Sequence, residues 1–267
     1  LLTILSVAVS LFLLGILFSV YASFYFQNVS TDQAQRLIVR HKVSLTQAMP
    51  TYYTEQIEAI PGVEVVVPQN WFGGIYIDSR PEHFFSRFAV DPQRIFALHP
   101  EYEVPPDQLE AFMNDRQGMA IGSTTAERVG LKLGQRITIQ GDIYPFDIEV
   151  TIRAIFRGPS DDATFFHQKY LEESLPQEWG GFVGFFGILA DSPEVVPRVA
   201  AAIDDHFRNA PEPTKTETEA AFLLSFINQI GNIKVFLMSI AGAIVFTIML
   251  VSANTMAMSV WPTELMV

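Results

Sequence analysis

Residues 146–156 read FDIEVTIRAIF, a stretch in which apolar and polar side chains alternate. A period of two places successive side chains on opposite faces of a strand, so this pattern predicts a long β-strand. Arg136–Gln140 predicts another strand shortly before it, preceded by Gly134 and followed by a turn at Gly141-Asp142. The chain therefore contains a folded domain that is built around a β-sheet.

Further strands and helices are predicted on both sides of these two strands. Gly118–Gly122 is typical of a strand, and Ser123 or Thr124 caps a short helix that ends at Gly130. The remaining strands are predicted at 36–42, 63–67, 74–77, 85–90 and 182–190, and helices at 51–60, 105–114 and 193–207. This mixture predicts an α+β domain with two subdomains that hold one sheet each.

The two ends of the chain differ from this middle part because they carry no charge. Leu1–Gln27 and Val235–Thr263 lack charged side chains, and the residues between them hold all 17 basic and 28 of the 29 acidic residues. Each end contains an uncharged run of 26 residues. As a helix such a run measures about 39 Å, more than a bilayer core of about 30 Å. The runs predict two transmembrane helices, and the first is too long for a signal peptide.

The sequence thus predicts a membrane-anchored α+β protein in five parts. The two transmembrane helices span 1–27 and 235–260, the domain spans 28–215, a stalk helix spans 216–234, and 261–267 form a truncated end. Residues 28–35 lack Pro and Gly, so they are predicted to extend the first helix as a second part of the stalk. Because the chain starts without Met and stops just after a span, we interpret it as a fragment.

Small side chains in the second span predict where another helix packs. Ser239 and Ala243 are four residues apart, as are Ala253 and Ala257, and this spacing lets helix backbones approach closely in lipid. Asn254 is the most polar side chain of the span. It either hydrogen-bonds a neighbouring helix or reaches the lipid headgroups.

Composition and motifs exclude several functional classes. A formal net charge of −12 leaves no basic surface for nucleic acid. With no cysteine, the chain has no disulfide, thiolate metal site or cysteine nucleophile. The P-loop, HExxH, GxSxG and GxGxxG motifs are all absent from the sequence. The sequence therefore predicts no catalytic, cofactor-binding or metal-ligating residue.

A few local clusters have both a functional and a structural interpretation. Trp71–Gly74 is either an exposed contact loop or core packing at a strand start, and we favour packing. Asp161-Asp162, with His167 nearby, is either a binding loop or a solvated turn, and we favour the turn. The histidines are scattered singly, without the spacing of metal ligands, at His41, His83, His99, His167 and His206.

Several stretches together resemble one family of membrane proteins. They are LIVRHKVS (37–44), PGVEVVVPQNWFGG (61–74), VGLKLGQRITIQG (129–141), PTKTETEAAF (213–222) and VSANTMAMSV (251–260). In this order, between two spans, they resemble permease subunits of ABC transporters of the MacB, FtsX and LolC type. The stretch 129–141 resembles a recurring element of the MacB-like periplasmic core domain.

The resemblance implies a fold, partners and a location. Such a permease has four spans and lies in the bacterial inner membrane, with its periplasmic domain between the first two spans. It works as a dimer, with a second copy or a paralogue, and with a separate cytoplasmic ATPase that binds the ATP. Closure of the ATPase is passed along the helices to the periplasmic domains, a mode called mechanotransmission, for export or for lipoprotein and envelope substrates. The permease itself is no enzyme and needs no cofactor, although a periplasmic partner protein is implied.

The end of the chain departs from this family. Residues 261–267 read WPTELMV, whereas the family continues with a charged cytoplasmic segment, and Pro262 would interrupt a continuing helix. The third and fourth spans are absent from the chain. No residue can therefore be assigned to contact with the ATPase.

Two other functional classes share the same layout. A two-span sensor with a periplasmic ligand-binding domain has an identical order of segments, but it continues after Val260 with a kinase or a signalling coiled coil. A membrane-anchored enzyme would need a clustered nucleophile, base or metal set, which the sequence does not present.

Overall fold

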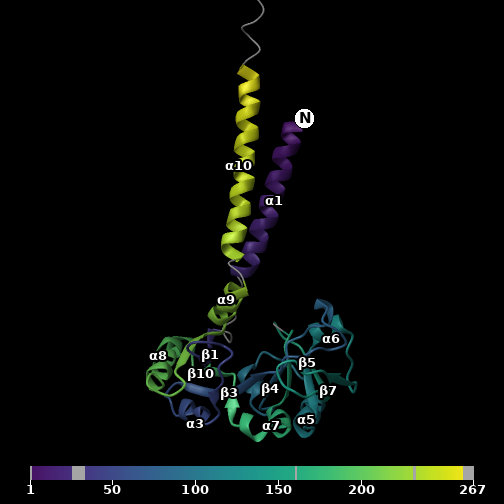
Figure 1. Ribbon diagram of the computed structural model, residues 1–267, viewed down its shortest axis with the longest axis vertical. Coiled ribbons are helices and arrows are strands. Elements are labelled where there is room, and N and C mark those ends of the chain that lie inside the picture. Colours follow the sequence, from purple (N-terminus) through teal and green to yellow (C-terminus); the bar gives the residue numbers. More distant parts are fainter. Residues whose placement is uncertain (1, 26–33, 160, 231–232, 261–267) are drawn as a thin grey trace, which may run out of the picture. The chain divides into compact units, whose positions relative to one another are not determined.

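The computed structural model describes residues 2–25, 34–159, 161–230 and 233–260 (Figure 1). The chain divides into two compact units. One combines Leu1–Val29 with Ala220–Val267, and the other comprises Ser30–Glu219. The second unit contains the β-sheet, and we call it the sheet domain.

Long helices dominate the first unit. They are α1 (Leu2–Tyr25), α9 (Glu219–Ile230) and α10 (Ile233–Val260), and α1 contacts α10. On α1 the side chains of Ser10, Leu14 and Leu17 are half-buried, at the spacing that forms one face of a helix. Among the helices of the described ranges, none has both the length and the apolar character required to cross a membrane. The membrane anchoring of 1–27 and 235–260 stays a prediction.

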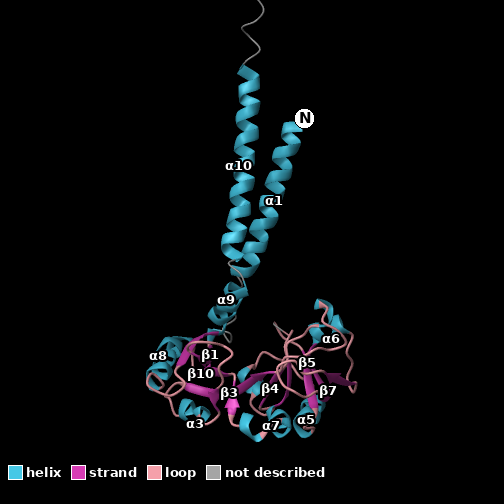
Figure 2. Cartoon of the chain, in the orientation of Figure 1, coloured by secondary structure: helices cyan, strands magenta, loops and turns pink. Residues whose placement is uncertain are grey.

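The sheet domain contains a nine-stranded mixed sheet (Figure 2). Its strands, in spatial order, are β11 (Thr214–Thr218), β1 (Arg36–His41), β10 (Phe185–Ala190), β3 (Val63–Trp71), β4 (Phe88–Val90), β8 (Thr164–His167), β5 (Gly118–Gly122), β7 (Ile148–Phe156) and β6 (Arg136–Ile139). A separate pair joins β2 (Met49–Pro50) to β9 (Phe182–Val183). The α-helices of the domain are α3 (Tyr53–Glu58), α4 (Ile95–Leu98), α5 (Pro106–Asn114), α6 (Ser123–Val129), α7 (Gln168–Ser174) and α8 (Val196–His206).

The prediction of two subdomains with one sheet each is wrong in its sheet arrangement. Strand β3 is nine residues long and pairs with β10 over most of its length, whereas Gln69–Trp71 pair with β4. Strand β4 then pairs in parallel with β8, so both halves of the domain belong to one sheet. Such long-range pairing joins strands far apart in the sequence, and local patterns do not encode it.

The core lies on both faces of this sheet. Neighbouring residues of one strand, such as Val66 and Val67 or Phe165 and Phe166, pack into different hydrophobic clusters because side chains alternate across the sheet. Helices α3 and α8 cover one cluster, α6 and α7 a second, and α4 and α5 a third. The sheet domain therefore buries apolar side chains on two layers, as expected for a mixed α/β domain.

Most predicted elements are confirmed, and several need correction. The strands predicted at 118–122, 136–140 and 146–156 form to within two residues, as Gly118–Gly122, Arg136–Ile139 and Ile148–Phe156, and Gly130 ends α6 in the left-handed conformation with φ of 77°. Gly74–Ile77 is no strand, because it makes only isolated bridges. The strand predicted at 85–90 begins at Phe88, and the strand predicted at 182–190 is divided between β9 and β10.

The start of the predicted stalk helix also needs correction. Thr216–Thr218 belong to strand β11, which pairs with β1, and the helix begins at Glu219. Threonines favour strands, and the pairing with β1 satisfies the backbone here. The predicted extension of the first helix over 28–35 falls mostly on residues outside the described ranges, as does 261–267.

Candidate functional site

Strands β1 and β11 bring the two ends of the sheet domain together. They are antiparallel neighbours, with Leu37 opposite Thr218 and His41 opposite Thr214. The stretches LIVRHKVS and PTKTETEAAF, which carry part of the family resemblance, therefore lie side by side. The chain enters the domain at β1 and leaves it from β11, so both connections to the helical unit start at one edge of the sheet.

Arg36, the first residue of β1, joins these two connections. Its Nε donates to Oε2 of Glu219, the residue directly after β11, at 2.7 Å. Its Nη1 lies 2.7 Å from Oε1 of Glu101 without hydrogen-bond alignment, so this second contact is an ion pair. Arg36 is only 3% exposed. A buried guanidinium between two carboxylates holds its partners in a defined geometry.

His99 completes the environment of Glu101. Its Nδ1 lies 3.5 Å from Oε1 of Glu101, and its ring stacks on Tyr102 with centroids 4.7 Å apart. Burial acts to raise the pKa of Glu101, but the contact with His99 and the charge of Arg36 outweigh it, so that pKa lies below its ordinary value. Burial also raises the pKa of Tyr102. Glu101 is therefore a carboxylate, and Tyr102 a neutral phenol, at neutral pH.

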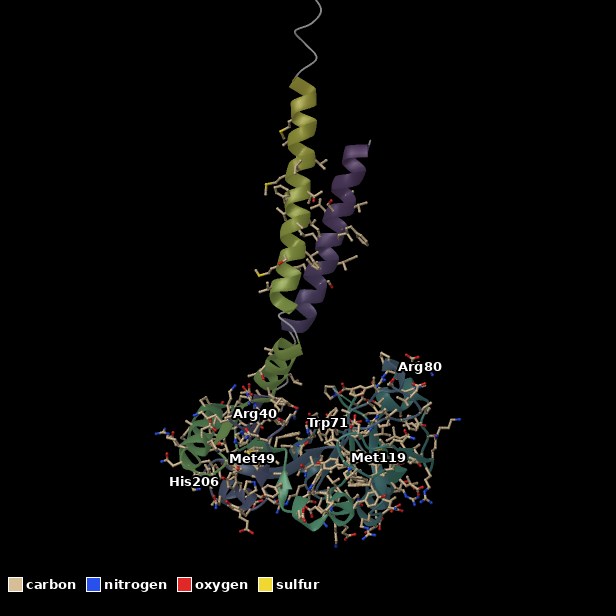
Figure 3. All side chains as sticks on the ribbon, viewed as in Figure 1. Arg40, Met49, Trp71, Arg80, Met119 and His206 are labelled. Atoms are coloured by element: carbon tan, nitrogen blue, oxygen red, sulfur yellow. The ribbon has the colours of Figure 1, made fainter. Side chains whose placement is uncertain are left out.

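A second ion pair ties the same two strands together further along. Arg40, on β1, is labelled in Figure 3. Its Nε donates to Oε1 of Glu217 on β11 at 2.8 Å, and Nζ of Lys215 lies 2.7 Å from the other oxygen of that carboxylate. Burial tends to raise the pKa of Glu217, but Lys215 and Arg40 lower it below its ordinary value. We call Arg36, Arg40, Glu101, Glu217 and Glu219 the root cluster.

The root cluster is suited to holding β1, β11 and the start of α9 together. Each of its carboxylates faces an arginine within 3 Å, so none is free to act as a base. Breaking a buried pair leaves an uncompensated charge and costs several kcal/mol.

The structure places three of the predicted span residues on an exposed part of α10. The side chains of Ser239, Ala243 and Ala253 are exposed, and Oγ of Ser239 donates to the carbonyl of Val235. The half-buried residues of α10 lie at other positions, namely Ile240, Ala241, Ile244, Ile248, Val251 and Ser252. The side chains of Asn254 and Ala257 lie outside the described residues. Whether Ser239 and its neighbours pack against another chain stays a prediction.

The clusters at Trp71–Gly74 and at Asp161-Asp162 have the structural roles that we favoured from the sequence. Phe72 is fully buried and stacks on Tyr144 at 5.4 Å, which confirms core packing at the end of β3. The carboxylate of Asp161 accepts hydrogen bonds from Ser123 and Thr124 at the start of α6. His167 is buried in β8, where its Nε2 lies 2.7 Å from the carbonyl oxygen of Phe112.

The remaining histidines also have ordinary polar partners. His41 lies beside Glu212, His83 beside Asp78 and His206 beside Gln56. Within the described ranges no three His, Asp or Glu side chains gather into a set that could hold a metal ion. The histidines therefore contribute to packing and surface pairing in this structure.

The root cluster was not predicted from the sequence. Arg36 and Glu219 are separated by 183 positions, and the arginine is the first residue of a strand that reads RLIVRH. The one available signal was that charge itself, because a guanidinium directly before the apolar run Leu37–Val39 needs a partner if it is buried. The sequence does not say which of 29 acidic residues supplies it.

Comparison with known families identifies the domain. Residues 1–206 match the family described as the MacB-like periplasmic core domain. The chain belongs to this family. The resemblance derived from the residues is thereby confirmed. The matched range includes every strand of the sheet domain except β11, and from here we also call the sheet domain the MacB-like domain. Comparison with curated proteins found no match.

Solved structures similar to the MacB-like domain come from distant sequences. The periplasmic region of MacB from Actinobacillus actinomycetemcomitans has a TM-score of 0.49 and 7% identity, covering 73% of this chain and 92% of that chain. The extracellular domain of the noncanonic ABC-type transporter YknZ from Gram-positive bacteria has a TM-score of 0.46 and 11% identity, covering 68% and 99%.

Proposed function

We propose that this chain is the permease subunit of an ABC-type transporter in the inner membrane. Its uncharged runs at 1–27 and 235–260 anchor it in the bilayer, and its MacB-like domain lies in the periplasm. Membership of the MacB-like family supports this assignment. The length of the two uncharged runs supports the anchoring. The chain itself hydrolyses nothing, binds no cofactor and depends on a cytoplasmic ATPase.

The observation that carries the mechanistic part is the bond between Arg36 and Glu219. Both connections to the helical unit emerge from adjacent strands, and the buried guanidinium of Arg36, the first residue of β1, bonds Glu219, the first residue of α9. A movement of the helices, driven by ATP in the partner, is therefore passed to the whole sheet rather than to a flexible loop. This is the arrangement that mechanotransmission requires. The substrate of this transporter is either a molecule that is exported or a component of the cell envelope.

The first test uses the intact native protein with an affinity tag. Purification in mild detergent should recover a P-loop ATPase in stoichiometric amount, with ATP hydrolysis that depends on the permease. Recovery of a kinase or a chemotaxis adaptor, with no ATPase, would contradict the proposal and favour the two-span sensor.

The second test addresses transmission. Addition of ATP to the purified complex should change hydrogen exchange in β1 and β11. Phe226→Pro interrupts α9 because proline removes an internal hydrogen bond and clashes with the preceding turn. It should abolish the ATP-dependent change while the exchange of β5 and β7 stays native. An unchanged response in this variant would show that α9 does not transmit the movement.

A further inference from the structure

Two strands end the nine-stranded sheet, and other parts of the chain contact both of them. On β11 the outward N–H of Thr216 donates to Oδ2 of Asp204, on α8, at 3.1 Å. Beside β6, Ile75 and Gln140 exchange two backbone hydrogen bonds, of 2.8 and 3.0 Å. Ile77 follows with φ of 62°, a strained left-handed conformation that a β-branched residue rarely adopts. Edge strands invite pairing with another chain, so such contacts are protective.

A third edge lies within the sheet, along the first part of β3, whose place is labelled in Figure 2. Strand β3 pairs with β10 from Val63 to Gln69, but it pairs with β4 only over Gln69–Trp71, because β4 is three residues long. The side of Val63–Pro68 that faces away from β10 therefore has no partner strand among the described residues.

The phase of the ladder shows which backbone groups face this open edge. The N–H of Phe72 donates to the carbonyl of Arg87, directly before β4, at 2.9 Å. Backbone groups alternate between the two edges of a strand, so Val66 and Pro68 face the same side as Phe72, whereas Gln69 faces β10. Proline has no N–H to donate, and it is therefore tolerated at an edge.

The N–H of Val66 lacks a hydrogen-bond acceptor within the described part of the chain. Val66 is 0% exposed, so water does not replace that acceptor. A buried N–H without a partner is rare in folded proteins, because it loses the hydrogen bond that it makes to water in the unfolded chain. The carbonyl of Val66 accepts only a long bond, of 3.3 Å, from Nη1 of Arg94. This edge would therefore gain from an incoming strand.

Arg94 lies across the open edge as a cover. Besides the carbonyl of Val66, its Nη1 bonds Oε1 of Glu58 on α3, whereas Arg94 itself directly precedes α4. Helices α3 and α4 pack on opposite faces of the sheet, so this ion pair bridges the edge from one face to the other. The two side chains are 45% and 38% exposed, and exposed pairs contribute little to stability. An incoming segment can therefore displace Arg94.

A groove of about 380 Å³ follows this edge. Its lining comes from β3, α3 and the start of α4, namely Val63–Val66, Glu58, Gln93, Arg94 and Ala97. Of these described lining residues Arg94 alone is basic, whereas Glu58 and Glu64 are acidic. Displacement of Arg94 thus leaves an acidic groove in a chain of net charge −12, and charge complementarity favours a basic occupant.

We propose that the first part of β3 binds an extended, basic segment of a partner protein, which pairs with Val66 and Pro68 and displaces Arg94. The residue opposite Val66 exchanges two hydrogen bonds with it, as in an antiparallel ladder, and satisfies its N–H. The residue two positions away donates to the carbonyl of Pro68. A lysine or arginine of the segment takes the place of Arg94 on Glu58. Main-chain bonds supply the affinity of such strand addition, and the side chains supply its specificity.

A model peptide tests this proposal with the full chain in mild detergent. The probe is a fluorescein-labelled octapeptide of alternating lysine and valine, and its binding is followed by fluorescence anisotropy. We expect saturable binding. An octapeptide of alternating glutamate and valine has a similar strand preference with the opposite charge. A lysine–valine octapeptide with methylated backbone nitrogens keeps the charge but cannot donate to the edge. Neither control peptide should bind.

Protein variants locate the site. Glu58→Gln with Glu64→Gln removes the carboxylates of the groove and should weaken binding roughly tenfold. Glu149→Gln with Glu173→Gln is the matched control, because it removes the same charge from exposed ion pairs on β7 and α7 and should leave binding unchanged. Arg94→Gln uncovers the edge and should strengthen binding about threefold. All of these side chains are exposed, so native circular dichroism is expected.

Hydrogen exchange shows where the peptide pairs. The N–H of Val66 should exchange more slowly when the lysine–valine peptide is bound, whereas exchange in β6 should not change. Equal weakening by the two double variants would overturn the proposal, as would equal binding of the methylated peptide. It would also fail if the Arg94→Gln variant bound no peptide or if exchange at Val66 stayed the same. The measurement needs neither ATP nor an ATPase, so its outcome is independent of the proposed transport function.

Discussion

Nε of Arg36 donates to Oε2 of Glu219 at 2.7 Å, although the two residues are 183 positions apart. The bond closes the sheet domain at the point where the chain enters and leaves it. Arg36 also contacts Glu101, so three distant parts of the sequence meet at one guanidinium. In the permease that we propose, this is the place where movement of the helices enters the sheet.

Loss of Glu101 should destabilise the domain strongly. Glu101→Gln removes a carboxylate that is 9% exposed and leaves Arg36 with one ion pair. Because the guanidinium stays buried, we expect a loss of about 3 kcal/mol in the free energy of unfolding, measured by urea denaturation. Glu149→Gln is the matched control, since it breaks an exposed pair with Arg136 and should cost less than about 1 kcal/mol. Equal losses would show that burial of the root cluster adds nothing.

The free energy of unfolding should fall at acidic pH because two carboxylates of the root cluster become protonated. The pKa values of Glu101 and Glu217 are lowered in the folded protein. A lowered pKa contributes stability that is present above the unfolded value of about 4.3 and is lost as pH falls through the folded value. The free energy of unfolding should therefore drop below about pH 5. In a Glu101→Gln, Glu217→Gln double variant the slope should be shallower, and an identical slope would rule out this origin.

Relief of the strain at Ile77 should stabilise the domain. Asparagine tolerates the left-handed conformation better than a β-branched residue, and Ile77 has little buried surface to lose. We expect Ile77→Asn to raise the free energy of unfolding by about 0.5–1 kcal/mol. Ile143→Asn is the control, because it exchanges a similarly exposed isoleucine without positive φ. A gain in both variants would indicate an effect of polarity rather than of backbone strain.

Truncation of Phe166 should cost far more than truncation of an exposed phenylalanine. Phe166 is fully buried in β8 and packs edge-to-face on Phe72, with ring centroids 5.8 Å apart. Phe166→Ala should lower the free energy of unfolding by about 3–5 kcal/mol because it leaves a cavity. Phe84→Ala, at an exposed position, should cost less than about 1 kcal/mol. Thermal and urea denaturation of both variants would test this contrast.

Two glycines of the sheet domain should respond differently to a methyl group. A Cβ on Gly122 would overlap the backbone of Asp161, whereas a Cβ on Gly184 would lie 3.4 Å from the carbonyl oxygen of Gln69. Gly122→Ala should therefore reduce the melting temperature markedly, because backbone must shift to relieve the clash. Gly184→Ala should change it little. Similar melting temperatures for the two variants would mean that the loop at Asp161 moves aside at low cost.

The local alternation of apolar and polar residues identified the strands that expose one face to solvent. Strand β7 alternates between buried and half-exposed or exposed side chains, and residues 148–156 form it as the alternation predicts. Strand β8 was missed because Thr164–His167 are buried on both faces and show no alternation. Strand β11 was interpreted as helix because its polar residues continue into α9 without Pro or Gly.

Composition and short-range periodicity predicted two uncharged runs with a charged α+β domain between them, and five short stretches of sequence carried the resemblance to the MacB-like family. These properties depend on neighbouring residues alone. The three-dimensional fold was needed to show that nine strands form one sheet, that Arg36 meets Glu101 and Glu219, and that β11 and β6 are the edge strands. Those features depend on which distant strands pair, and that choice is set by the packing of the whole domain rather than by any single stretch.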